Sequence, residues 1–162
     1  PTIVRSMPNT PAALGIGMTA LIASKGVSEQ QTEDATHLMQ AVGETVWLND
    51  EKQMDAVTAI SGSGPAYVFH MAEALTGAGV SLGLAEPLAA KLAIQTIIGA
   101  SGMMAEGGAV PAQLRRDVTS PAGTTEAALD ILMAEQVGLG SLMRQTTQAA
   151  AQRSRDLSSS KD

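Results

Sequence analysis

The stretch from Pro87 to Ala105 constrains the fold of this chain more than any other feature of its sequence. Apolar residues recur there on every side: Leu88, Ala89, Leu92, Ala93, Ile94, Ile97, Ile98, Ala100, Met103 and Met104. A proline suits the first turn of a helix, and Gly107-Gly108 ends it, which predicts one helix about 28 Å long at ~1.5 Å per residue. A helix apolar all round has to be covered on several sides, and we expect a second copy of the chain to supply part of that cover.

Polar interruptions distinguish this stretch from a membrane span. Lys91, Gln95 and Thr96 break the apolar run, and Gly99 and Gly102 interrupt it further. A span needs a longer, cleaner apolar segment. The sequence therefore predicts a buried helix and no membrane partner. No signal peptide opens the sequence, and we expect a soluble, cytoplasmic protein.

The composition predicts a core of aliphatic side chains. Hydrophobic residues make up 44% of the 162 residues, but aromatic residues only 2%: Trp47, Tyr67 and Phe69. Small aliphatic side chains favour close helix–helix packing over a β-sandwich, so the expected fold class is mainly α.

Residues 1–49 have a different texture from the rest. They predict a strand at the start, a second strand over Ile16–Ser24, a helix and a third strand over residues 45–48, as at the edge of an α/β sheet. The helix begins with a capping box, Ser28 with Gln31, and ends at Gly43. Because the sequence starts abruptly and without an initiator Met, we expect it to be a fragment of a longer protein.

Residues 50–162 predict an all-helical second domain. Asp50 is suited to cap a helix, with Gln53 in its first turn. Further helices are expected at about residues 66–78, 87–105, 111–117, 126–134 and 141–157. The sequence thus divides into a partial α/β domain, 1–49, and a helical domain, 50–162.

Charge and residue content exclude several classes of function. The formal net charge is −6, which argues against a nucleic-acid partner. There is no Cys, and His37 and His70 are isolated, so no metal site is predicted. No Ser-His-Asp set and no carboxylate pair with useful spacing is present.

Two small-residue segments, each directly before a predicted helix, are the first candidate sites. One is Ser61–Pro65, with Ser63, Gly64 and Pro65, and the other is Ser120–Thr125, with Ser120, Gly123, Thr124 and Thr125. The first turn of a helix carries unpaired N–H groups, glycine lets a ligand approach, and hydroxyls add donors. Such loops could hold a small carboxylate without Arg. Ordinary helix capping is the alternative, and for either loop alone the spacing favours it.

Met7-Pro8-Asn9-Thr10-Pro11 is the third candidate. Two prolines fix the backbone, and Asn9 and Thr10 offer polar groups at the end of a strand, where open α/β sheets bind ligands. A structural turn with Asn9 satisfied locally is an equal alternative.

These strings resemble the pyrroline-5-carboxylate reductase family. The resemblance lies in three strings: residues 4–11 (VRSMPNTP), 55–67 (DAVTAISGSGPAY) and 114–125 (LRRDVTSPAGTT). It implies hydride transfer from NADPH or NADH to the imine carbon of pyrroline-5-carboxylate, giving L-proline, the last step of proline biosynthesis. It also implies a homodimer through the helical domain, in many members part of a larger ring.

The resemblance also implies roles for the candidate residues. Ser120 and the backbone N–H of Thr124 match positions that hold the substrate carboxylate, in the loop that includes Gly123. Thr125 matches the threonine whose hydroxyl meets the ring nitrogen, so it is the catalytic candidate. Ser63, Gly64 and Pro65 would line the substrate and nicotinamide region. Met7, Pro8, Asn9 and Thr10 would touch the nicotinamide end of the cofactor.

One departure from the family is large. Its members begin with a dinucleotide-binding half that carries a Gly-x-Gly-x-x-Gly loop, and this sequence has none. Residues 1–49 would then be the C-terminal remnant of that Rossmann-type domain, and we expect the chain alone to be inactive. Thr124 stands where the family often has Ala or Gly, which is tolerable if only its backbone acts.

Two other interpretations compete with the reductase. The chain could be a non-catalytic helical dimerisation module whose glycine segments only cap helices. It could also belong to a two-domain hydroxy-acid dehydrogenase, which needs a catalytic Lys in the helical domain. Lys91 is the one Lys there after Lys52 that lies in a helix, and it lacks the loop context of such a residue.

Overall fold

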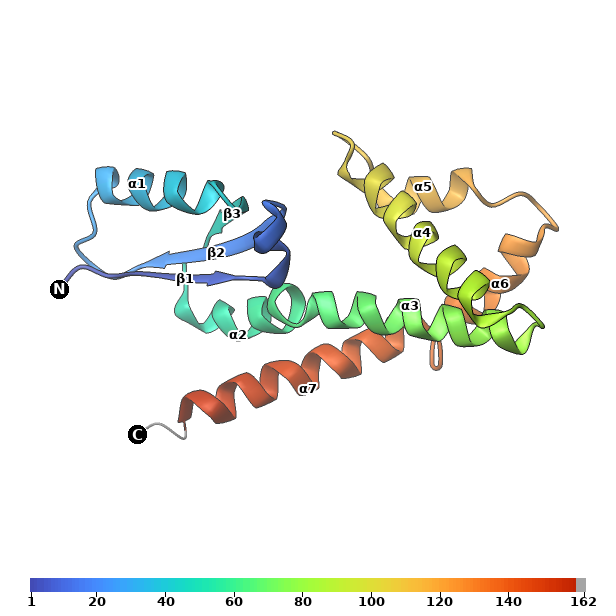
Figure 1. Ribbon diagram of the computed structural model, residues 1–162. Coiled ribbons are helices and arrows are strands. Elements are labelled where there is room, and N and C mark those ends of the chain that lie inside the picture. The colour runs from blue at the N-terminus through green and yellow to red at the C-terminus, as the bar shows by residue number, and fades with distance from the viewer. Residues whose placement is uncertain (160–162) are drawn as a thin grey trace. The chain divides into compact units, whose positions relative to one another are not determined.

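A computed structural model describes residues 1–159, and the chain divides into two compact units. Unit 1 comprises Pro1–Tyr67 together with the chain from Gln145 onward, and unit 2 comprises Val68–Arg144. Figure 1 shows the elements of both. This division follows compactness, and the domain boundary after Asn49 stays a prediction.

Unit 1 holds a three-stranded sheet in the order β1-β2-β3. β1 (Val4–Pro8) runs antiparallel to β2 (Gly17–Ala23), and β2 runs parallel to β3 (Gly43–Trp47). The core of the unit is centred on β2, where Thr19, Ala20 and Leu21 are at most 1% exposed. All three predicted strands are present. β1 extends as far as Pro8, and a proline is acceptable at the end of an outer strand.

Helix α1 (Glu29–Gln40) connects the two parallel strands and lies along one face of the sheet (Figure 1). The predicted capping box is confirmed: Ser28 Oγ accepts the N–H of Gln31 at 3.2 Å, and Gln31 Oε1 accepts the N–H of Ser28 at 3.0 Å. Trp47 fixes the helix to β3, because its indole N–H donates to Thr36 Oγ1 at 2.9 Å.

After β3 and the short connection over residues 48–50, the chain winds into consecutive helical turns of three kinds. They are the 3-10 helix η2 (Glu51–Gln53), the α-helix α2 (Met54–Val57), the π-helical turn η3 (Thr58–Gly62) and the α-helix α3 (Gly64–Ser81). Asp50 caps the first of them, as predicted. Its carboxylate accepts the N–H of Lys52 in η2 at 2.9 Å. The expected glycine-rich break over Ser61–Pro65 is wrong, since Ser63 alone separates η3 from α3.

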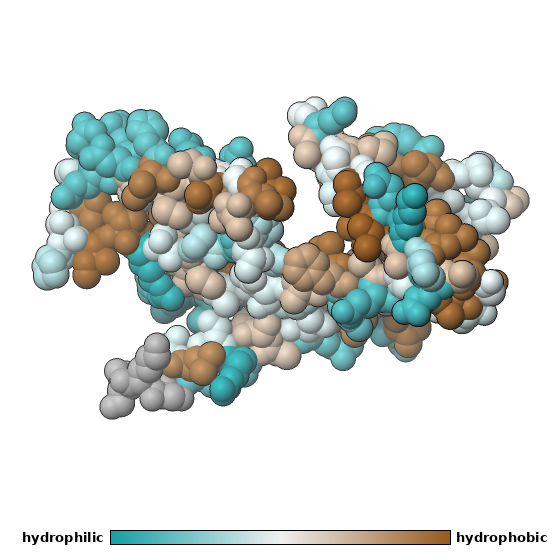
Figure 2. Space-filling model, in the orientation of Figure 1, coloured by the Kyte–Doolittle hydropathy of each residue, from teal (hydrophilic) through white to brown (hydrophobic). Residues whose placement is uncertain are grey.

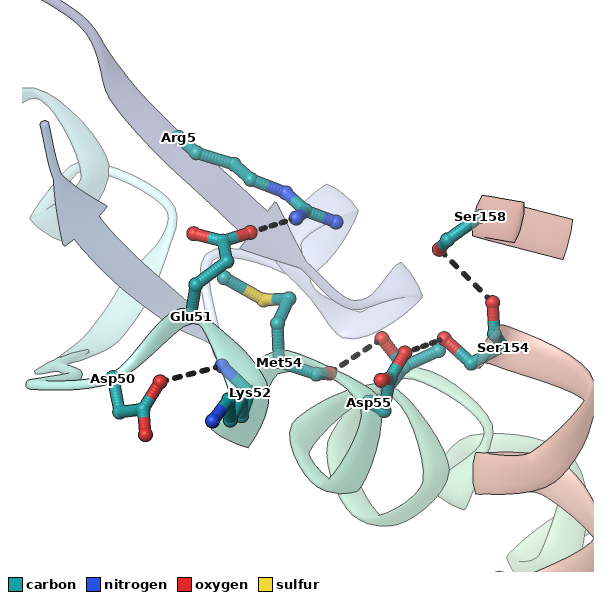
Figure 3. Close-up of polar contacts among 9 residues, drawn as sticks. Arg5, Asp50, Glu51, Lys52, Met54, Asp55, Ser154 and Ser158 are labelled. Atoms are coloured by element: carbon teal, nitrogen blue, oxygen red, sulfur yellow. Dashed lines mark hydrogen bonds and ion pairs between the residues drawn. The ribbon is translucent and has the colours of Figure 1, made fainter. Parts of the chain in front are cut away.

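Polar contacts attach these turns to the rest of unit 1 (Figure 3). Arg5 of β1 forms an ion pair with Glu51, and Ser154 of α7 (Leu139–Ser159) donates to Asp55 Oδ1 at 2.6 Å. Met54, 3% exposed, packs beneath them. Helix α2 therefore lies between β1 and the C-terminal half of α7.

The regular structure described in unit 2 consists of helices joined by turns. Beside most of α3 it contains α4 (Glu86–Ala105), α5 (Pro111–Asp117), α6 (Thr124–Leu132) and the first residues of α7. α5 begins and ends where it was predicted to, with Pro111 at its first position. α6 begins at Thr124, before the predicted start at residue 126, so Thr124 and Thr125 lie in its first turn instead of in a loop.

Helices α3 and α4 approach each other closely at Gly79. A Cβ atom placed on Gly79 would lie 2.9 Å from the Cβ of Ala89, which is closer than two carbon atoms normally come. Ala89 and Ala93 are the two residues of α4 that are buried. Small side chains on both helices therefore allow this contact.

The rest of α4 is exposed in the single chain, so the expectation of a buried helix is not met within one copy. Leu92, Ile94 and Ile98 are each 50% exposed or more. Figure 2 shows brown, hydrophobic side chains over this helix with a few teal, hydrophilic ones between them. By length and composition α4 is also the one helix of residues 1–159 that could cross a membrane, a test that core helices of soluble proteins pass as well.

Candidate functional site

In unit 1 the structure brings two of the predicted segments together, Met7–Thr10 and Ser61–Pro65, which meet where Asn9 contacts Ser61. Met7 and Pro8 are the last residues of β1, and Thr10 begins the 3-10 helix η1 (Thr10–Leu14), which the sequence analysis did not foresee. Between them Asn9 has an extended backbone. The side-chain amide of Asn9 donates to the carbonyl oxygen of Ser61 at 3.2 Å. The end of β1 is thus fastened to the helical turns that follow β3.

The π-helical turn η3 supplies the other side of this contact. In a π-helical turn the N–H bonds to the carbonyl oxygen five residues back. Here the N–H of Ser63 donates to the carbonyl oxygen of Thr58 at 2.8 Å. The Tyr67 hydroxyl donates to the carbonyl oxygen of Ala59 at 3.0 Å and so secures the turn from α3. Single π-helical turns inserted in helices occur frequently at functional sites.

Met7 and Ser63 both line an open cleft of about 600 Å³ within unit 1. Its other lining residues come from β1, η3 and α7: Arg5, Thr58, Ala150, Arg153, Ser154, Leu157 and Ser158. Arg5 is paired with Glu51, and Arg153 is exposed to solvent. Nothing in the local sequence of Arg153 marks it as a candidate, since only the fold places α7 beside β1.

Beside this cleft, Gly62 lies close to the side chain of Met7. The Cα of Gly62 faces Met7, and a Cβ there would lie 3.1 Å from Met7 Cε. Ser61 through Pro65 are all half-buried. This part of unit 1 therefore combines an apolar methionine side chain with glycine and serine.

In unit 2 the segment Ser120–Thr125 forms a tight turn ahead of α6. Ala122 has φ +56°, the one positive value among the non-glycine residues described. Its N–H donates to Glu126 Oε2 at 2.7 Å, and the N–H of Gly123 donates to the carbonyl oxygen of Ser120 at 3.0 Å. Both bonds keep the turn folded back on the start of the helix.

The first turn of α6 presents donors that no side chain caps. Gly123 is the N-cap residue and has no side chain to accept the N–H groups of Thr124 or Thr125. A Cβ on Gly123 would overlap Ser120 Oγ, so glycine is needed for Ser120 to lie there. Thr125 is half-buried and Ser120 is exposed. Uncapped N–H groups at a helix start, with two hydroxyl-bearing side chains beside them, form a chemically suitable place for a carboxylate.

Two observations concern the other titratable groups of residues 1–159. His70 is paired with Glu73 at 3.0 Å on the exposed side of α3. Among residues 1–159, no three His, Asp or Glu side chains are grouped as a metal site would need.

A family model described as pyrroline-5-carboxylate reductase dimerisation matches residues 51–157, well over half of the chain. The chain belongs to this family. The match includes α4, the π-helical turn and the turn ahead of α6. The resemblance inferred from the sequence is thereby confirmed.

Individual relatives extend the likeness to nearly the whole chain. A pyrroline-5-carboxylate reductase from Pseudomonas aeruginosa is 50% identical over 155 residues, which cover 96% of this chain and 56% of the relative. One from Pisum sativum is 42% identical over the same shares. The chain thus spans a little over half the length of the curated relatives that it matches.

Solved structures show the same relation. A pyrroline-5-carboxylate reductase from Coxiella burnetii superposes with a TM-score of 0.90 at 42% identity, over 96% of this chain and 57% of that one. The pyrroline carboxylate reductase of Plasmodium falciparum, solved with NADP bound, gives a TM-score of 0.82 at 33% identity, over 96% and 61%. These matches confirm the predicted fold class, a mainly helical fold preceded by the remnant of an α/β domain.

Proposed function

We propose that the chain is the substrate-binding and dimerising part of a pyrroline-5-carboxylate reductase. The reaction is hydride transfer from NADPH or NADH to the imine carbon of pyrroline-5-carboxylate, giving L-proline in the cytoplasm. The observation that carries the proposal is the uncapped start of α6 behind the Ser120–Gly123 turn, within the family match. Residues 1–49 would be the end of the dinucleotide-binding domain, and residues 50–162 the helical domain.

The residues of the α6 turn would bind and orient the substrate. The N–H groups of Thr124 and Thr125 and the hydroxyl of Ser120 would hold its carboxylate, helped by the positive end of the helix dipole. The Thr125 hydroxyl would meet the ring nitrogen and keep the imine in one orientation. A protonated imine is already electrophilic, so alignment is the main task left to the protein.

The residues of unit 1 would hold the nicotinamide end of the cofactor. Met7–Thr10 would contact it from the end of β1, Asn9 only through its backbone because both ends of its side-chain amide bind within the protein, and Ser63, Gly64 and Pro65 would contact it from the start of α3. The pyridine nucleotide supplies the hydride when it is bound. The contribution of the chain is to fix the ring and to exclude water from it.

We also propose that a second copy covers α4. The family match spans this helix, and its exposed side chains Leu92, Ile94 and Ile98 are of the kind that obligate dimers bury. This assigns α4 to a homodimer interface instead of a membrane. Larger rings built from such dimers would need further contacts.

The function is tested in a hybrid in which this chain replaces the matching 155 residues of the Pseudomonas aeruginosa relative. We expect pyrroline-5-carboxylate-dependent oxidation of NADPH in the hybrid. In Thr125→Ala we expect kcat/KM to fall roughly tenfold or more, about 1.4 kcal/mol of transition-state stabilisation. Thr125→Ser keeps the hydroxyl and serves as the matched control.

Each outcome points to one interpretation. Activity that Thr125→Ala leaves unchanged would retain the reaction and remove the site assignment. A folded, dimeric hybrid without activity, assayed beside the active relative, would favour the non-catalytic dimerisation module. The one observation that favours this alternative is the exposed apolar surface of α4.

A further inference from the structure

The carbonyl oxygen of Ser61 lacks the donor that a helix would normally give it. In an α-helix this oxygen would accept the N–H four residues on, but that residue is Pro65, which has none. The next N–H along the chain, that of Ala66, donates to the carbonyl oxygen of Ser63 at 3.0 Å. A half-buried carbonyl without a partner is costly, so a donor from elsewhere is needed.

Asn9 supplies that donor from a distant part of the sequence. Its Nδ2 donates to the Ser61 carbonyl oxygen at 3.2 Å and lies 3.4 Å from Ser61 Oγ. Its Oδ1 accepts the N–H of Met18 at 2.9 Å. Because a backbone N–H can only donate, this second bond fixes which end of the amide is the oxygen. One side chain therefore joins the end of β1, the start of β2 and the π-helical turn.

We propose that Asn9 is a positioning residue, whose side chain holds the Met7–Thr10 segment and the Ser61–Gly62 turn at a fixed separation. This rests on the proposed function, in which the first contacts the cofactor and the second lines the substrate region. Both polar ends of the amide are engaged within the protein, so the side chain acts through its neighbours. The contact of Met7 with Gly62 is what the amide keeps in place.

Three variants separate the two ends of the amide. Asn9→Ala removes both, whereas Asn9→Asp keeps the acceptor for Met18 and replaces the donor to Ser61 with an oxygen. Asn49→Ala, in the exposed segment after β3, is the matched control. The first readout is amide hydrogen exchange, measured on the 162-residue chain and on each variant of it.

We expect the Ser63 N–H, which closes the π-helical turn, to exchange about tenfold faster or more in both Asn9 variants. The Met18 N–H should exchange faster in Asn9→Ala alone. Asn49→Ala should change neither. Unaltered exchange at Ser63 in both variants would overturn the proposal, whatever activity the hybrid enzyme has.

Kinetics of the hybrid give the second readout. Loss of positioning should lower kcat about tenfold in Asn9→Asp and change the KM for NADPH and for pyrroline-5-carboxylate by less than about threefold. Pro65→Ala restores a backbone donor to Ser61, so adding it to Asn9→Ala should slow the exchange of the Ser63 N–H again, a readout that is independent of the part proposed for Pro65 in the site. A raised KM for NADPH with unchanged kcat would make Asn9 a direct cofactor ligand and overturn the proposal.

A purely structural role is also distinguishable. It would lower the melting temperature while leaving kcat per folded enzyme unchanged, and that result would overturn the proposal too. An unsubstituted hybrid that shows no activity would count against the proposed function, and the exchange experiment would still decide whether Asn9 holds the turn.

Discussion

Ala122 occupies a backbone conformation that alanine rarely adopts. Its φ of +56° places the Cβ close to the following carbonyl oxygen, which costs roughly 1–2 kcal/mol for a residue other than glycine. The charge-assisted bond from its N–H to Glu126 offsets part of this cost. The strain lies two residues before α6, where it turns the backbone so that Gly123 can serve as the N-cap.

Replacing Ala122 by glycine should relieve this strain. Glycine accepts a positive φ without steric cost but makes the unfolded chain more flexible. Ala109, in the turn after α4, has no positive φ and is the matched control. We expect Ala122→Gly to leave the chain more stable than Ala109→Gly by about 1–2 kcal/mol in urea unfolding. Equal effects of the two changes would mean that Ala122 carries no strain.

The residues of the candidate site differ in how far the sequence could reveal them. Thr124 and Thr125 could be predicted as candidates from the sequence, because small and hydroxyl-bearing residues before an apolar run indicate the start of a helix. The conformation of Ala122 could not be predicted, since an alanine gives no indication of a positive φ. The partner of Asn9 lies 52 residues away, and local spacing left a locally satisfied turn as an equal alternative. The contacts of Asn9 depend on the fold of the whole unit.

At the scale of elements, local signals predicted where helices start better than where they end or whether they continue: α1 ends at Gln40, and Gly43, predicted to end it, is the first residue of β3. Ser28 with Gln31 marked the start of α1, and Pro111 marked that of α5. Gly62 and Gly64 with Pro65 predicted a break, because glycine and proline disfavour helix interiors. The structure continues through them as a π-helical turn, with Pro65 at the second position of α3, where a missing N–H does no harm within that helix. The donor that proline withholds from Ser61 comes from a tertiary contact that no helical pattern contains.

Two glycines of α3 give an element-scale test, because one faces α4 and the other does not. A Cβ on Gly77 meets no atom within 4 Å, whereas a Cβ on Gly79 would lie 2.9 Å from that of Ala89. Gly77→Ala should therefore stabilise the chain by about 0.5–1 kcal/mol through helix propensity. Gly79→Ala should destabilise it by about 1–3 kcal/mol through overpacking.

Urea unfolding of the two variants checks this pair. The reverse order of stability would contradict the α3–α4 packing. A loss in both would place Gly77 against a surface outside the single chain, and a dependence of that loss on protein concentration would identify a second copy.

At the scale of the molecule, a single chain leaves much apolar surface uncovered. Ile98 of α4 is 58% exposed, and Leu38 of α1 in the other unit is 72% exposed. We expect Ile98→Glu to weaken self-association at least about tenfold, roughly 1.4 kcal/mol, because a charge would be desolvated in the interface. Leu38→Glu makes the same chemical change outside the family's helical interface and should leave association unaltered.

Sedimentation over a range of protein concentrations measures both variants. Association that Ile98→Glu leaves intact would show that α4 is not the dimer helix. Greater loss in Leu38→Glu would move the interface to α1.

The hydrogen bond between Asp55 and Ser154 joins residues separated by 99 positions in the chain. A ribosome adding about 5–20 residues per second needs roughly 5–20 s to supply Ser154 after Asp55. During that interval β1, β2, β3 and α1 can already pair, but the side of α2 that α7 covers stays open. The apolar helix α4 emerges in the same period. Exposure of both surfaces is therefore greatest shortly before α7 leaves the ribosome, and that is when a nascent chain of this protein most needs a chaperone or a neighbouring copy.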